Sequence, residues 1–139
     1  MRSLAYECGK YLQDGTMFSH SQRTRELIDA VADTDVVGTV TRIEASFCFG
    51  ANKEFFGNDI RTKADGDPLG CIGDVGWYCV RLALLVFGKL GYGKPTRAVT
   101  FDATLNEEGV PVDATCFVAF QEVKPILCRT TAVGRVLCR

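Results

Sequence analysis

One nearly uninterrupted apolar stretch constrains the fold of this chain more than any other feature. Residues 68–88 read PLGCIGDVGWYCVRLALLVFG, in which turn-prone residues and glycines precede an apolar run that ends at Gly88. The pattern predicts a helix with Asp74 as its N-cap and Gly88 as its closing residue. A helix that is apolar on nearly all sides must be covered on most of them, because a surface helix keeps a polar face.

Three polar side chains interrupt this helix with a regular spacing. At 100° per residue, Asp74, Tyr78 and Arg81 occupy positions i, i+4 and i+7 and share one stripe. In one interpretation Asp74 only caps the helix, Tyr78 is a core residue and Arg81 is a surface charge. In the other, the three form the polar wall of a cavity, where a phenol beside a cation can give or take a proton.

Length, charge and hydropathy exclude several classes of protein. A chain of 139 residues with 47% apolar and 24% charged residues has the size and composition of one globular domain. The net charge is −1 and no cluster of Lys and Arg occurs, so we expect no nucleic-acid partner. The longest apolar run, Leu82 to Phe87, is too short for a membrane span, and residues 1–10 do not look like a signal peptide. We therefore expect a cytoplasmic protein that does not enter a membrane.

The cysteines do not predict a metal site or a disulfide framework. There are seven, with no C-x-x-C spacing and a single histidine to accompany them, so a zinc site is not expected. An odd number without a secretion signal favours cysteines that pack as small apolar side chains. The alternative, a cysteine-dependent hydrolase, would require a reactive thiol beside His20.

The remaining elements predict a mixture of helices and antiparallel strands. We expect helices over 3–13 and after residue 21, the second capped by Ser21 or Thr24 with Leu27, Ile28 and Val31 on its apolar face. Strands are expected over 15–19, 39–49, 96–105 and 112–120, the last two joined as a hairpin. Residues 50–66 are expected to be irregular, anchored by Phe55 and Phe56, and residues 121–139 are an edge strand or an abnormal end.

The run GCIGDVGWY resembles the signature of the glucose-fructose oxidoreductase/inositol dehydrogenase (Gfo/Idh/MocA-like) family, roughly G-G-x-L-x-D-x-G-x-H/Y. Asp74, Gly76 and Tyr78 take its last three defined places. Over about residues 5–120, the segments DGTMFSHSQRTRELIDAV, GTVTRIEASFCFG, NDIRTKADGDPLG and PTRAVTFDATLNEEGVPVDATCFVAF are similar in order to the family's C-terminal domain. The similarity is greatest to the dihydrodiol-dehydrogenase-like branch.

The resemblance implies roles for several residues. Tyr78 would be the proton-transfer group, and Asp74 would position it or bind a substrate hydroxyl. Arg61, His20 and Arg81 would lie on the substrate side of the cleft, His20 where many members carry an arginine. The family fold implies an α+β domain with a mostly antiparallel open sheet and helices packed on one face. The other face of the sheet would join subunits into a homo-oligomer such as a dimer.

The chain contains neither a G-x-G-x-x-G turn nor the family's Glu-Lys-Pro motif with its catalytic lysine. We therefore expect residues 1–139 to be a single partial domain, incomplete at both ends, of an NAD- or NADP-dependent oxidoreductase acting on a sugar, polyol or dihydrodiol. No cofactor is expected to bind this chain alone, and it is not expected to be active by itself. The alternative is a non-catalytic scaffold or binding domain derived from the same family.

Overall fold

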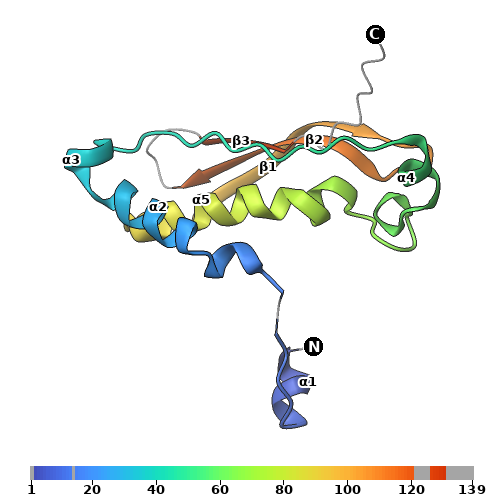
Figure 1. Ribbon diagram of the computed structural model, residues 1–139, viewed down its shortest axis with the longest axis horizontal. Coiled ribbons are helices and arrows are strands. Elements are labelled where there is room, and N and C mark those ends of the chain that lie inside the picture. Colours follow the sequence, from blue (N-terminus) through green and yellow to red (C-terminus); the bar gives the residue numbers. More distant parts are fainter. Residues whose placement is uncertain (1, 14, 121–125, 131–139) are drawn as a thin grey trace.

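The computed structural model describes residues 2–13, 15–120 and 126–130, and it shows an α+β fold. Strands β1 (Pro95–Leu105), β2 (Pro111–Phe120) and β3 (Ile126–Thr130) form an antiparallel open sheet in the order β1-β2-β3. The long helix α5 (Trp77–Lys89) runs along one face of this sheet, and α2 (Gln22–Ala32) lies against α5 on the same side (Figure 1). The predicted hairpin is confirmed, with Val118 opposite Ala98 and Ala114 opposite Ala103.

The core lies between α5 and β2. Ala83 and Phe87 of the helix pack against Val118 and Phe120 of the strand, and all four are at most 4% exposed. The rings of Phe87 and Phe120 stack with their centroids 5.0 Å apart. The apolar run thus forms a covered helix as predicted, because only burial against the sheet removes so much apolar surface from water.

The helix has different ends from those predicted. Cys71 already has helical backbone angles, and a π-helical turn η3 (Ile72–Gly76) precedes α5, so Asp74 lies inside the helical path and is not its N-cap. The extra residue of a π turn is typical of functional sites. At the other end Gly91, not Gly88, adopts the left-handed conformation, with φ +82°.

The end of α5 has the bonds of a Schellman motif. The Gly91 N–H donates to the Gly88 carbonyl at 3.2 Å, and the Tyr92 N–H donates to the Phe87 carbonyl at 2.9 Å. The rings of Tyr92 and Phe87 make the apolar contact that accompanies this motif, with centroids 5.4 Å apart.

Two predicted strands are wrong. Residues 17–20 form the 3-10 helix η1 (Met17–His20) in place of a strand, and residues 39–49 are extended but pair only through a single bridge at Ala45. The alternation in 39–49 reflects burial on one side, since Val40 and Ile43 pack against the core. A strand also requires a ladder of backbone partners, which the described residues do not supply there.

The helices of the first sixty residues are shorter or more numerous than predicted. Helix α1 (Arg2–Glu7) is shorter than the predicted 3–13, and it stands away from the rest of the fold in Figure 1. The Ser21 cap of α2 is confirmed by a 3.1 Å bond from the Thr24 N–H, and α3 (Thr34–Val37) follows. The segment expected to be irregular contains α4 (Lys53–Asn58) and the 3-10 helix η2 (Ile60–Thr62).

β3 pairs with β2 and lies at the end of the three-stranded order, as the edge-strand alternative for the tail predicted. Residues 121–125 and 131–139 of that tail lie outside the described residues. Within the described part of the chain, no helix is both long and apolar enough to cross a membrane.

Candidate functional site

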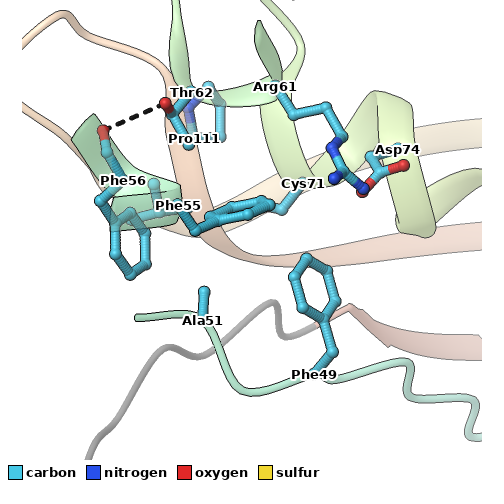
Figure 2. A pocket seen from close by; sticks show the side chains of 10 residues that line it. Phe49, Ala51, Phe55, Phe56, Arg61, Thr62, Cys71, Asp74 and Pro111 are labelled. Carbon is cyan, nitrogen blue, oxygen red and sulfur yellow. Dashed lines mark hydrogen bonds and ion pairs between the residues drawn. The ribbon is translucent and has the colours of Figure 1, made fainter. Parts of the chain in front are cut away.

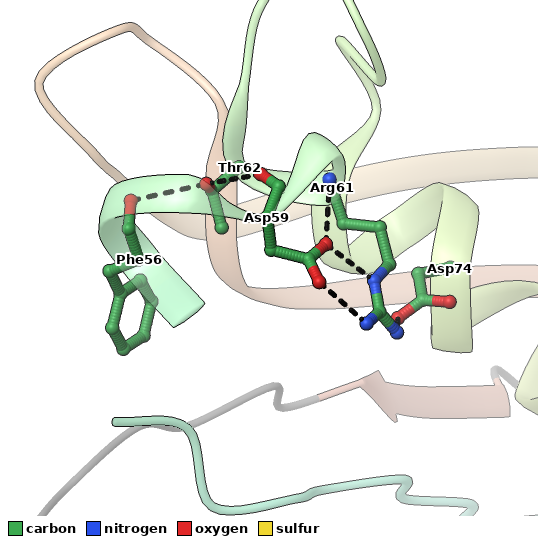
Figure 3. A network of polar contacts seen from close by, with 5 residues as sticks. All are labelled: Phe56, Asp59, Arg61, Thr62 and Asp74. Carbon is green, nitrogen blue, oxygen red and sulfur yellow. Dashed lines mark hydrogen bonds and ion pairs between the residues drawn. The ribbon is translucent and has the colours of Figure 1, made fainter. Parts of the chain in front are cut away.

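Arg61 is fixed between two carboxylates and an aromatic ring, an arrangement that we call the Arg61 clamp. Its Nε and Nη2 donate to Oδ1 and Oδ2 of Asp59 at 2.8 and 2.9 Å, and its Nη1 donates to Oδ2 of Asp74 at 3.2 Å (Figure 3). The guanidinium carbon also lies 4.9 Å from the centre of the Phe55 ring, within range of a cation–π contact. The clamp therefore joins η2 to the π turn that precedes α5.

Asp59 and Arg61 keep their charges at neutral pH. The hydrogen bond from the Arg61 side chain, helped by that from the Arg61 backbone N–H, lowers the pKa of Asp59 to about 2. The same side-chain bond raises the pKa of Arg61 above its ordinary value, with a further contribution from the charge of Asp74. Both partners are thus ionised across the physiological range.

The short helices that carry Arg61 are formed by local capping. The carboxylate of Asp59 accepts the Arg61 N–H at 3.0 Å and caps η2, while the Asn52 side chain accepts the Phe55 N–H at 2.9 Å and caps α4. The Thr62 hydroxyl, almost fully buried, lies 2.7 Å from the Asp59 carbonyl and 3.2 Å from the Phe56 carbonyl. These bonds fix the backbone on both sides of Arg61.

The turn of the β1–β2 hairpin supports the same segment from the other side. The Asn106 side-chain amide donates to the Thr62 carbonyl at 2.8 Å. The Glu108 carboxylate accepts from Lys63 Nζ at 3.0 Å and from the Ala64 N–H at 3.1 Å. The bond from Lys63, with that from Ala64, lowers the pKa of Glu108. Residues 44 to 45 positions away along the chain thereby help to determine where η2 lies.

The clamp borders an open cleft of about 580 Å³. Its floor and walls come from the extended segment, α4, η2, the π turn and α5: Phe47, Phe49, Gly50, Ala51, Asn52, Phe55, Arg61, Asp74, Val75 and Tyr78. The cleft thus combines aromatic walls with a cation, a carboxylate and a phenol, which is the mixture expected of a small-molecule site.

Tyr78 reaches this cleft through an aromatic cluster. The centre of its ring lies 3.9 Å from that of Trp77, 5.2 Å from that of Phe47 and 6.0 Å from that of Phe18. The ring is half-buried, and its hydroxyl makes no hydrogen bond to any residue that the structure describes. A phenol that is positioned by packing and has an unused hydroxyl is available to a ligand.

The structure brings three of the five predicted site residues together. Arg61, Asp74 and Tyr78 all line the cleft. Arg81 is exposed and donates instead to the Ser19 hydroxyl at 3.4 Å, so the predicted polar stripe extends only from Asp74 to Tyr78. His20 is exposed at the end of η1 and lines a separate hollow, with no cysteine among its described lining residues, which are Gln13, Gly15, Thr16, Met17, His20 and Ser21.

Sequence reasoning missed two parts of this site. Asp59 was not singled out, although an Asp two residues before Arg61 at a helical start is the recognisable signal of a cap. Nothing in the sequence indicated that Phe47 and Phe49 line the cleft, because the alternating pattern of their segment predicted a strand. Phe55, expected only to anchor its segment, also contacts the guanidinium of Arg61.

The arrangement suits the binding of a hydroxylated molecule. Three of the five guanidinium N–H groups are used within the clamp, and Oδ1 of Asp74 makes no hydrogen bond to a described residue. Among the described residues, no group of three His, Cys, Asp or Glu side chains is placed to hold a metal ion. No family model matches this sequence.

Proposed function

We propose that this chain forms the substrate-side domain of an NAD- or NADP-dependent oxidoreductase that acts on a hydroxyl or carbonyl of a sugar, polyol or diol. The observation that carries the proposal is the convergence of Arg61, Asp74 and Tyr78 from separate segments on one open cleft. The similarity of GCIGDVGWY to the oxidoreductase signature, in which Asp74 and Tyr78 occupy defined places, supports the same assignment.

Each residue has a role in this proposal. Arg61 and Asp74 bind adjacent hydroxyl groups, the first through its unused N–H groups and the second through Oδ1. Tyr78 exchanges a proton with the reacting oxygen, for which its hydroxyl needs to be accessible and unoccupied. The nicotinamide supplies the hydride chemistry, and the aromatic walls offer an apolar surface to the carbon skeleton of the ligand.

The test must supply a cofactor domain, because the 139 residues contain no G-x-G-x-x-G turn. We would join the chain to the dinucleotide-binding domain of an enzyme of the resembling family and measure nicotinamide reduction with sugars, polyols and diols. Tyr78→Phe should lower turnover by about 10²- to 10⁴-fold, the usual loss when acid–base assistance is removed. The matched control is Tyr6→Phe, because Tyr6 lies on α1 and is 89% exposed.

Two results would contradict the proposal. Turnover that Tyr78→Phe leaves unchanged would remove the phenol from the mechanism. A fusion that binds a polyol without any nicotinamide reduction would favour the alternative, a non-catalytic binding domain.

The subunit interface is part of the same proposal. The face of the open sheet opposite α5 would join two copies, by analogy with the resembling family. Sedimentation equilibrium of the fusion protein, with dimer expected, tests this part separately from turnover.

A further inference from the structure

A small apolar cavity opens beside the polar end of the cleft. Its volume is about 20 Å³, and ten residues line it: Phe49, Ala51, Phe55, Phe56, Arg61, Thr62, Cys71, Asp74, Pro111 and Val112. In Figure 2 the rings of Phe49 and Phe55 and the side chain of Ala51 surround this space, with the Arg61 and Asp74 pair at one side.

The cavity adjoins the proposed substrate cleft. Phe49, Ala51, Phe55, Arg61 and Asp74 line both spaces. A molecule whose hydroxyl groups bind Arg61 and Asp74 therefore has its neighbouring carbon next to the mouth of the cavity. The cleft would therefore hold the polar part of a ligand, and the cavity would hold an adjacent substituent of the same ligand.

The walls of the cavity do not suit a hydroxyl group. The Thr62 hydroxyl already lies within hydrogen-bonding distance of the Asp59 and Phe56 carbonyls. Three of the five Arg61 N–H groups are directed at Asp59 and Asp74. Arg61 and Asp74 lie at one side of the cavity, and phenyl rings, Ala51 and Val112 make up most of the rest. A hydroxyl placed among these apolar side chains, away from Arg61 and Asp74, would lose its water without gaining a partner.

The size of the cavity limits what it can accept. A space of one water-sized sphere is about 10 to 15 Å³, and this cavity is only slightly larger. It can hold one methyl group, and it is too small for a ring.

From these features we infer that the site prefers ligands in which a methyl group is attached next to the hydroxylated carbons, such as 6-deoxy sugars or short methyl-terminated vicinal diols. This inference rests on the proposed function, since it takes the cleft to be the place where the hydroxyl groups bind. The apolar cavity selects the methyl compound over the analogue with a hydroxymethyl group at the same position.

The experiment compares two sugars that differ at one atom, 6-deoxygalactose (D-fucose) and D-galactose. Titration calorimetry of each against the 139-residue chain should give a dissociation constant about 10-fold lower for D-fucose, the lower end of the range for one group in an apolar pocket. Val112→Leu adds a carbon to the wall of the cavity and should bring the ratio of the two constants to about one. The matched control, Val36→Leu, changes an exposed residue of α3 and should keep the wild-type ratio.

The outcomes separate this inference from the proposed function. Equal affinities of the wild-type chain for both sugars, or tighter binding of D-galactose, would overturn the methyl preference while leaving the turnover test of the fusion protein unaffected. Absence of binding by either sugar would overturn it as well. A preference that Val112→Leu retains would show that another part of the cleft recognises the methyl group. Because the ratio is measured first on the wild-type chain, it does not depend on how well the variant folds.

Discussion

Gly70 lies where the helical path to α5 meets the start of β2, and replacing it with alanine should destabilise the fold strongly. Its φ is +47°, and an added Cβ would lie 2.3 Å from the Pro111 carbonyl oxygen and 2.6 Å from a methyl carbon of Val110. The backbone conformation costs an L-residue about 1 to 2 kcal/mol. Overpacking against a backbone atom costs about 1 to 3 kcal/mol more. Gly70→Ala should therefore lower the free energy of unfolding by about 2 to 5 kcal/mol.

Two other glycines, at the opposite end of α5, provide matched controls. Gly91 has φ +82° with no atom within 4 Å of an added Cβ, so Gly91→Ala should lose only the conformational part, about 1 to 2 kcal/mol. Gly88 lies within α5 at an ordinary φ, also with open space around it. Gly88→Ala should be neutral or should stabilise the chain by up to about 1 kcal/mol, because alanine favours a helix interior.

The assay is urea unfolding of the three variants and the wild-type chain, followed by the fluorescence of Trp77 and by far-ultraviolet circular dichroism. From the highest to the lowest free energy of unfolding, the expected order is Gly88→Ala, wild type, Gly91→Ala and Gly70→Ala. Equal losses for Gly70→Ala and Gly91→Ala would refute the argument from close contact between Gly70 and β2. No loss for Gly70→Ala would contradict the close approach of Gly70 to Val110 and Pro111.

Two further predictions concern the Arg61 clamp and a helix cap. In a carbon-13 NMR titration the Asp59 carboxyl should titrate near its lowered pKa of about 2, and Arg61→Gln should move it back toward 3.8. Because the pKa of Asp59 is lower in the folded than in the unfolded state, the stability that this pair contributes is complete above about pH 4 and is lost as the pH falls through about 2. An unshifted pKa of Asp59 in the wild-type chain would contradict the clamp. Ser21→Ala removes the acceptor of the Thr24 N–H and should cost about 1 kcal/mol in urea unfolding, whereas the exposed Ser46→Ala should cost almost nothing, and equal effects would argue against the cap.

Local sequence patterns were sufficient for the elements whose signals are local. The buried helix follows from an apolar run, and the β1–β2 hairpin follows from alternation on both sides of turn residues. The Ser21 cap follows from a side chain placed three residues before the N–H from which it accepts a hydrogen bond. Each of these signals acts between residues close together in the chain, so the sequence expresses it directly. Asp74 and Tyr78 were also expected at the site from their helical spacing, and Arg61 from the family resemblance.

Only the tertiary structure decided how these residues are combined. The residues around Asp74 are typical of a helix N-cap, but the π turn places Asp74 within the helical path. Its carboxylate accepts a hydrogen bond from Arg61 instead. Arg81 shares the helical spacing of Tyr78, yet it faces Ser19 outside the cleft. The extended segment 39–49 alternates like a strand, but a strand exists only where another chain segment supplies backbone partners. Pairings of this kind depend on residues distant in the sequence, and periodicity along one segment carries no information about them.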